Sequence, residues 1–250
     1  TNSITGKRYA DDPAIMTWEL ANEPRPMRPA AREAYLAWIS TTAAFIKSRA
    51  PRQLVALGHE GYIGTEGMEL FEAAHRDPNV DYLTIHIWPK NWEWFRKDSM
   101  EAGFQTVAAK TLAYINEHRQ VAERLKKPLV VEEFGLPRDG QSFDPSSSTH
   151  LRDGYYGLVF GQWLQSALNG GGLAGVNFWA FGGSARPKRG QVYWKPGDDY
   201  MGDPPMEEQG LNTVFDSDQS TWQVVTAHTA AAKLKRAKPV KTKAKAQRAN

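Results

Sequence analysis

The sequence contains no cysteine in 250 residues. This absence excludes disulfide bonds, cysteine-ligated zinc, iron–sulfur clusters and thiol nucleophiles. The sequence also lacks any run that approaches 18 consecutive apolar residues, so we expect no membrane-spanning helix. Hydrophobic residues make up 41% of the chain, which is enough for a sizeable core. The length is compatible with one large domain or two small ones.

Acidic residues are absent from the last twenty positions, residues 231–250, which hold eight lysines and arginines. The whole chain has 31 basic and 28 acidic residues and a net charge of +3. The 31 basic residues less these eight leave 23, so residues 1–230 carry a net charge of −5. An acidic body does not suit nucleic acid, and we predict no nucleic-acid partner. We expect residues 231–250 to form the end of the last helix and a basic, disordered tail.

Short apolar runs alternate with longer amphipathic stretches along the chain. The runs are rich in Val, Ile and aromatic residues and are predicted to be buried strands: Ala14–Leu20, Leu54–Leu57, Tyr82–Ile87, Leu129–Val131 and Gly175–Ala180. The predicted helices are Ala30–Arg49, Gly67–His75, Thr106–Lys126, Thr149–Asn169 and Trp222–Arg236, with a long loop over Gly182–Gly210. This alternation predicts an α/β fold with parallel strands, either an open doubly wound sheet or part of a (β/α)8 barrel. No GxGxxG follows a strand, which argues against a dinucleotide-binding sheet.

Each predicted strand ends in polar or aromatic residues that are capable of chemistry. These strand ends are Ala21–Arg25, Gly58–Gly61, His86–Trp88, Glu132–Gly135 and Trp179–Phe181. Functional groups at the carboxyl ends of successive parallel strands are what the active-site face of a barrel requires. The strand ends therefore favour the (β/α)8 barrel.

Glu23 and Glu133 are the carboxylates that we predict to react. Each directly follows a strongly apolar strand, where a charge is costly unless it is paired or hydrogen-bonded. Two such residues on non-adjacent strands of one barrel would face each other across its mouth, as glycoside cleavage requires. Strand alternation sends Glu132 and Glu133 to opposite sides, and periodicity alone leaves open which one points into the mouth. For Glu60 two interpretations stay open, a catalytic role and a structural ion pair with Arg25.

Aromatic residues at the strand ends and in the following loops favour a sugar ligand. Indole rings stack well on the C–H faces of pyranose rings, and Trp88, Trp92, Trp94, Trp179 and Trp194 all lie in such positions. The histidines show neither HxH nor HExxH spacing, so we predict no metal site and read His86 as a hydrogen-bonding residue.

These motifs together resemble those of the β-mannanases (mannan endo-1,4-β-mannosidases) of glycoside hydrolase family 5, retaining enzymes built on (β/α)8 barrels. The matching segments are Asp12–Arg25, Gly58–Gly61, His86–Pro89, Val130–Gly135 and Asn177–Ala180. An Asn-Glu-Pro after a buried strand with a later Glu-Phe-Gly is specific to this clan, and the contexts of Asn22 and Glu60 are similar to mannanases. The resemblance extends from the first residues to about 230.

The resemblance implies a role for each matching residue. Glu23 corresponds to the acid/base and Glu133, directly before Phe-Gly, to the nucleophile. Asn22 corresponds to the residue that hydrogen-bonds the sugar 2-hydroxyl. The other implied substrate-binding residues are Arg25, Glu60, His86, Trp88 and Trp179. The loop residues Trp92 and Trp194 are further aromatic candidates for substrate binding. Trp88 stands where many relatives have Tyr and lacks that residue's hydroxyl.

The resemblance also implies a partial barrel. Asn-Glu-Pro closes the fourth strand in this family, yet here it arrives at residue 22, so residues 1–230 correspond to strands 4 to 8 of the catalytic domain. We expect a preceding segment or another chain to complete the barrel, because five strands would leave two bare edges. The chain alone is expected to be unstable or inactive.

The expected activity is a retaining endo-β-1,4-mannanase that hydrolyses internal bonds of mannans by a two-glutamate double displacement. The alternatives are another family 5 β-glycanase, such as a cellulase or glucomannanase, or a non-catalytic carbohydrate-binding fragment. The partner is a β-mannan or another β-1,4-glycan. No cofactor is implied, and the resemblance implies a secreted or periplasmic location.

Overall fold

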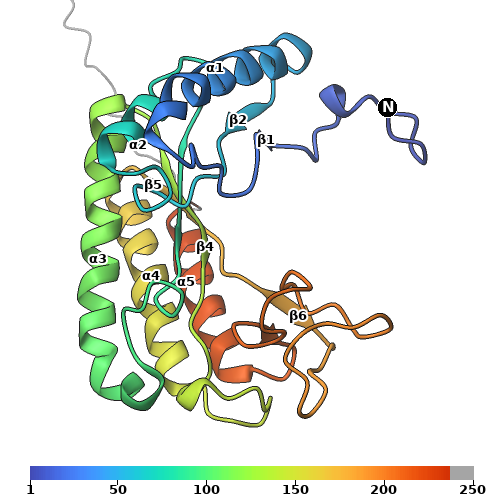
Figure 1. Cartoon of the computed structure of the whole chain (residues 1–250), viewed down its shortest axis with the longest axis vertical. Helices are drawn as coiled ribbons and strands as arrows, with labels where there is room; N and C mark the ends of the chain where they lie inside the picture. The colour runs from blue at the N-terminus through green and yellow to red at the C-terminus, as the bar shows by residue number, and fades with distance from the viewer. Residues whose placement is uncertain (237–250) are drawn as a thin grey trace, which may run out of the picture.

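Five parallel strands form the centre of the computed structural model, which describes residues 1–236 (Figure 1). The strands are β1 (Thr17–Glu19), β2 (Leu54–Ala56), β3 (Leu83–Ile87), β4 (Leu129–Phe134) and β5 (Leu173–Val176). β1 pairs with β2, and β3, β4 and β5 form a second parallel sheet in chain order. The Asp81 N–H, just before β3, donates to the Val55 carbonyl of β2 over 2.8 Å and links the two sheets. Parallel strands that neighbour one another in chain order are the arrangement of a barrel segment.

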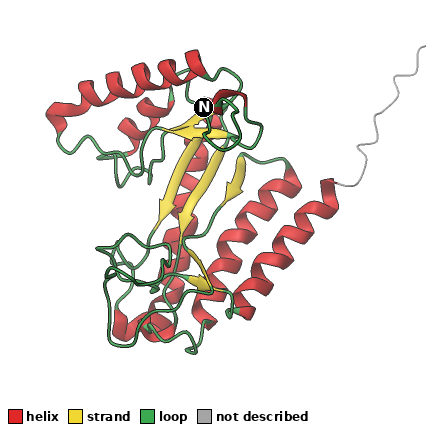
Figure 2. Ribbon diagram, turned by 90° about the vertical axis from the view of Figure 1, so that its right-hand side faces the viewer, coloured by secondary structure: helices red, strands yellow, loops and turns green. Residues whose placement is uncertain are grey.

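Helices follow the strands and pack behind and beside them (Figure 2). They are α1 (Arg32–Arg49), α2 (Met68–His75), α3 (Met100–Leu125), α4 (His150–Asn169) and α5 (Gln219–Arg236), with short 3-10 turns at Tyr9–Asp11, Pro29–Ala31, Lys97–Ser99 and Asp139–Gln141. Within residues 1–236, no helix combines the length and the hydrophobicity that crossing a lipid bilayer requires. Of the predicted tail, the part after α5 lies outside the described residues.

The longest helix, α3, shows why these segments are helical. Its buried residues include Val107, Thr111 and Ile115, which recur every four positions and face the strands. The helix begins six residues before the predicted start at Thr106 because packing overrides the low helix propensity of Gly103. A Cβ at Gly103 would lie only 3.2 Å from the Phe95 side chain, so the glycine permits this close approach.

The last strand and the long loop differ from the prediction. The strand predicted over Gly175–Ala180 begins earlier, at Leu173, because this residue pairs with Leu129 at the start of β4. β5 ends at Val176, which pairs with Val131. Beyond β5 the backbone still follows β4, since the Trp179 N–H donates to the Phe134 carbonyl over 2.9 Å. The predicted loop opens with a short strand, β6 (Phe181–Gly183), which pairs in parallel with β7 (Val214–Phe215).

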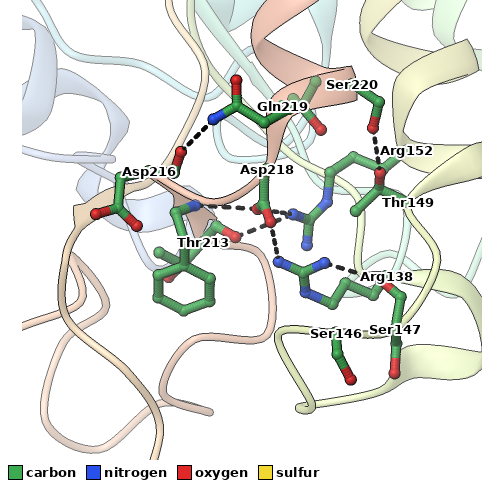
Figure 3. Close-up of polar contacts among 12 residues, drawn as sticks. Arg138, Ser146, Ser147, Thr149, Arg152, Thr213, Asp216, Asp218, Gln219 and Ser220 are labelled. Carbon is green, nitrogen blue, oxygen red and sulfur yellow. Dashed lines mark hydrogen bonds and ion pairs between the residues drawn. The ribbon is translucent and has the colours of Figure 1, made fainter.

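A buried ion-pair network fastens this long loop to α4 (Figure 3). Arg152 of α4 is fully buried and donates to the carbonyls of Leu136, Leu211 and Thr213. Asp218 forms ion pairs with Arg152, at 3.3 Å, and with the buried Arg138. The charges of two arginines are thus compensated by one carboxylate and several carbonyl oxygens, as burial requires. The network holds the loops that follow β4 and β5 in place.

Candidate active site

The loop after β1 delivers Asn22 and Glu23 to the carboxyl ends of the strands. The Glu23 N–H donates to the Gly58 carbonyl over 2.8 Å, which joins the ends of β1 and β2. Glu23 has a φ of 48°, a left-handed conformation that costs energy for a residue other than glycine. Gly58 permits the close approach, because a Cβ there would lie 2.0 Å from the Ala21 carbonyl oxygen. The backbone thus holds Glu23 in a strained position.

His86, at the end of β3, brings Glu23 and Glu133 together. Its Nδ1 lies 2.9 Å from Glu23 Oε1 and 3.3 Å from Glu133 Oε2. The His86 side chain is 2% exposed, against 26% for Glu23 and 15% for Glu133. One oxygen of each carboxylate and a nitrogen of His86 all lie within 4.8 Å of one another. The two carboxylates predicted from the strand ends therefore converge.

An irregularity in β4 places Glu132 as well as Glu133 against His86. Ile85 pairs with Val131 but the next residue, His86, pairs with Glu133, so Glu132 is an extra residue in the register. His86 Nε2 lies 3.9 Å from Glu132 Oε2, on the other side of the ring from Glu133. Strand alternation predicted that these glutamates would point to opposite sides, and they lie at different nitrogens of the imidazole ring, with Glu133 at the nitrogen that also contacts Glu23.

The net effect of burial and neighbouring charges is to raise the pKa values of both His86 and Glu133. Burial lowers the pKa of His86, but contacts with Glu132, Glu23 and Glu133 outweigh it and raise this pKa to about 9. Burial raises the pKa of Glu133, and the charge of Glu23 adds to the increase. The charge of His86 and the indole N–H of Trp88 oppose it. At neutral pH the ring is therefore a cation that holds two carboxyl groups.

Arg25 and Glu60 form an ion pair beside Glu23. The Glu60 side chain is 2% exposed, and Arg25 Nη2 also lies 3.7 Å from Glu23 Oε2. Burial and the charge of Glu23 raise the pKa of Glu60, while Arg25 opposes this. The ion pair predicted as one reading of Glu60 is present, and it reaches the carboxylate cluster through Arg25.

The predicted tryptophans fall into two groups. Trp88 donates its indole N–H to Glu133 Oε2 over 3.3 Å, so it supplies a hydrogen bond without a tyrosine hydroxyl. Trp88 and Trp179 both crowd Gly135, where a Cβ would lie 2.7 Å from the Trp88 ring and 2.8 Å from the Trp179 carbonyl oxygen. Trp88 therefore contacts the carboxylate cluster directly, whereas Trp179 is placed beside it by its backbone, and a substrate-binding role for its ring stays a prediction.

The other three tryptophans make contacts away from that cluster, and Trp94 packs edge-on against Trp92, with ring centroids 5.1 Å apart. Trp92 is partly buried against the hydrophobic core and contacts Tyr114, with ring centroids 5.1 Å apart. Trp194 stacks on Tyr200 in the loop between β6 and β7, with ring centroids 5.4 Å apart. The exposed side chain of Asn22 adjoins Glu23 in the chain. Substrate-binding roles for Trp92, Trp194 and Asn22 stay predictions.

The sequence interpretation missed Glu19, the last residue of β1. Its carboxyl group contacts Glu132 closely enough for a hydrogen bond, which requires that one of the two is protonated. The signal was available, because an acid inside the apolar run Ala14–Leu20 is costly unless it has a partner.

The cluster of Glu23, His86 and Glu133 also has the spacing of metal ligands. A metal requires a free lone pair on the imidazole. Here Nδ1 contacts both carboxylates, and the raised pKa of His86 keeps the ring protonated at neutral pH. The three side chains form a hydrogen-bonded cluster around Nδ1 of His86.

Comparison with known proteins places these residues in context. Residues 1–238 match the model of the family described as GH family 5 beta-mannosidase-like. The chain is 33% identical over 193 residues to mannan endo-1,4-beta-mannosidase 1 of Oryza sativa subsp. japonica, covering 71% of this chain and 42% of that protein.

Two crystal structures from Rhizomucor miehei are also similar. A glycoside hydrolase family 5 mannosidase gives a TM-score of 0.81 at 32% identity, covering 93% of this chain and 55% of that one. An endo-1,4-beta-mannanase gives a TM-score of 0.61 at 27% identity, covering 93% and 57%. The chain thus spans about half the length of the relatives that it matches.

Proposed function

We propose, because this chain belongs to the glycoside hydrolase family 5 β-mannosidase-like proteins, that it carries the catalytic carboxyl pair of a retaining β-1,4-mannan hydrolase. In this proposal residues 1–230 are the C-terminal portion of a (β/α)8 catalytic domain. Glu133 is the nucleophile and Glu23 is the acid/base. The family predicted from the strand-end motifs is the one that the comparisons identify.

In the first step, a Glu133 oxygen attacks the anomeric carbon of the mannosyl unit. The glycosidic C–O bond breaks, and Glu23 donates its proton to the leaving oxygen. Arg25 and His86 hold the Glu23 carboxyl in place during the transfer. The products are a shortened glycan and a glycosyl ester of Glu133.

In the second step, Glu23 acts as a base. It removes a proton from a water molecule, whose oxygen attacks the anomeric carbon and displaces the Glu133 carboxylate. Two displacements at one carbon retain its configuration. The imidazolium of His86 stabilises the carboxylate that is released, since it lies 3.3 Å from Glu133 Oε2.

The separation of the two carboxylates carries this proposal. An oxygen of Glu23 and an oxygen of Glu133 lie within 4.8 Å of each other. Retaining glycosidases hold their carboxyl groups about 5–5.5 Å apart, whereas inverting enzymes need about 6.5–9.5 Å to admit a water molecule. The short separation supports direct attack by a carboxylate.

Two substitutions and two substrates test the roles in the complete catalytic domain, since residues 1–250 alone are expected to leave the barrel open. Glu133→Gln removes the nucleophile and is expected to abolish turnover of both mannan and an aryl β-mannoside. Glu23→Gln removes the acid and is expected to slow mannan hydrolysis about 10²–10⁴-fold. The aryl mannoside should still form the glycosyl ester in Glu23→Gln, because a phenolate leaves without protonation. A burst of released phenol measures that step.

Glu117→Gln, the same change at an exposed position of α3, is the matched control and should keep full activity on both substrates. Circular dichroism checks that each variant is folded. Undiminished mannan hydrolysis by folded Glu133→Gln would refute the assignment of the nucleophile. Absence of the phenol burst from the aryl mannoside in folded Glu23→Gln would refute the assignment of the acid.

A second candidate is a mannosidase that releases mannose from the ends of short mannosyl substrates. It is favoured by the higher TM-score against the Rhizomucor mannosidase, 0.81, than against the endo-mannanase, 0.61. A fast fall in mannan viscosity supports internal cleavage, whereas release of free mannose alone supports the second candidate.

The wider alternatives have their own signatures. Preference for carboxymethyl cellulose over mannan would indicate a different β-glycanase. Binding of mannooligosaccharides without turnover would indicate a non-catalytic fragment. Because a mannan polymer is outside the cell, the proposed activity in polysaccharide degradation implies a secreted or periplasmic protein.

A further inference from the structure

A second pair of carboxyl groups lies behind His86, on the side away from Glu23 and Glu133. Glu132 of β4 and Glu19 of β1 come within hydrogen-bonding reach of each other. The Glu132 side chain is 9% exposed, and its Oε2 lies 3.9 Å from His86 Nε2. The mechanism above uses neither residue.

The carboxylate oxygens of Glu132 lack good hydrogen bonds from neutral donors. Its Oε1 accepts only a long hydrogen bond, 3.5 Å, from the Tyr82 hydroxyl, and its buried Oε2 has no hydrogen-bond donor among the described residues. A buried carboxylate oxygen without a donor is costly. A protonated Glu19 can supply a hydrogen bond, and a protonated His86 ring, with Nε2 at 3.9 Å from Oε2, supplies an ionic contact.

The charges around this position favour protonation of both groups. Glu19 is partly exposed at the end of β1. Partial burial of its carboxyl group and the contact with Glu132 together raise the pKa of Glu19 to about 7. His86 faces Glu132 on one side and Glu23 and Glu133 on the other, with Glu60 and His59 nearby. Tyr82 and Glu19 face Glu132.

An imidazole ring needs a fixed partner on one nitrogen to present the other in a defined state. A carboxylate beside Nε2 stabilises the protonated ring and directs Nδ1–H outward. Nδ1 is the atom that contacts both Glu23 and Glu133. Without the charge of Glu132, the buried ring would lose its proton more readily and both tautomers would become accessible.

Resting on the proposed function, we infer that Glu132, backed by Glu19, is a positioning residue. Its carboxylate orients His86 so that Nδ1–H faces Glu23 and Glu133, and it keeps a positive charge between them. That charge helps Glu133 to stay ionised beside Glu23. Glu132 touches neither the scissile bond nor the sugar in this assignment.

The test is the titration of His86 in the protein without substrate, followed by ¹⁵N and ¹³C NMR of the imidazole. In the wild type, both ring nitrogens should be protonated at pH 7, and the pKa should be near the value of about 9 given by the surrounding carboxylates. In Glu132→Gln, which keeps the shape and removes the charge, this pKa should fall by about one unit or more. Glu132→Asp, which keeps the charge, should restore at least part of the shift.

The pH profile of kcat/KM for mannan hydrolysis is the second readout. In Glu132→Gln the alkaline limb should move to lower pH, since the His86 ring that contacts Glu23 and Glu133 loses its proton more readily without the charge of Glu132. A purely structural role for Glu132 would lower the rate at every pH and leave the shape of the profile unchanged. Glu117→Gln, at the surface of α3, should alter neither the titration nor the profile.

The outcomes separate this inference from the proposed function. A neutral His86 at pH 7 in the wild type overturns the inference, even if Glu132→Gln does not fold. So does an unchanged His86 pKa in folded Glu132→Gln. A protein in which His86 titrates as expected but which cleaves no β-mannoside supports the contact with Glu132 and overturns the proposed function.

Discussion

Buried His118 should make the stability of this protein depend on pH. The ring lies on α3, is fully buried, and uses both nitrogens: Nδ1 donates to the Tyr114 carbonyl over 2.7 Å, and Nε2 accepts the Tyr62 N–H over 3.0 Å. Only the neutral ring can accept at Nε2. Burial lowers the pKa of His118 to about 4, and the hydrogen bond to Tyr114 only partly opposes this.

The sign and size of the effect follow from the two states. In the unfolded chain a histidine titrates near 6.5, so between pH 6.5 and 4 the unfolded state binds more protons than the folded state. Stability contributed by neutral His118 is therefore complete above about pH 6.5 and is lost as the pH falls toward 4. Over that window the loss is about 3 kcal/mol, at 1.36 kcal/mol for each pKa unit.

Urea unfolding of the wild type and His118→Gln at pH 7.5, 6.0 and 4.5 measures the effect. Glutamine does not titrate, and the other buried histidines are present in both proteins. The stability difference between them should shrink by about 2–3 kcal/mol from pH 7.5 to 4.5. His150→Gln, at an exposed position, is the matched control and should show no comparable trend. A His118→Gln difference that is the same at all three pH values would refute the reasoning.

Three further outcomes are expected. Arg152→Met leaves buried Asp218 with a weaker set of partners and should lower the unfolding free energy by about 3–5 kcal/mol; a thermal midpoint close to that of the wild type would contradict this. Gly58→Ala places a Cβ 2.0 Å from a carbonyl oxygen and should reduce both stability and activity, as measured by calorimetry and mannan hydrolysis; an unaltered protein would show that the strand ends separate freely. Trp88→Phe removes the N–H donor to Glu133 and should lower kcat/KM about tenfold while the protein stays folded, and a rate equal to the wild type would exclude a role for that hydrogen bond.

The sequence pattern was sufficient for the overall architecture. Apolar runs with polar ends predicted five parallel strands with helices between them, and the structure contains β1 to β5 in chain order. The resemblance to family 5 and the partial barrel are confirmed by the family match and by similar structures of which this chain covers about half. Hydrophobic periodicity is local information, so it can be recognised without coordinates.

The convergence of Glu23 and Glu133 also followed from the sequence, because parallel strands place their carboxyl ends on one face. The exact start of α3 did not follow, since Phe95 packs on Gly103 from outside the helix. Neither did the attachment of the long loop to α4 through Arg152, whose partners Leu211 and Thr213 are 59 and 61 positions away.

Residue identity and strand order thus determined that carboxylates from two strand ends meet on one face, because both are encoded in short stretches of chain, and the family resemblance then singled out Glu133 rather than Glu132. The tertiary structure alone decided how Glu132 and Glu133 share His86, since a bulge depends on the register between two strands. It also decided that Glu19 lies against Glu132, and that Trp88 reaches Glu133 with an indole N–H. Such contacts join segments that are distant in sequence, and only the packing of the whole sheet brings them within hydrogen-bonding distance.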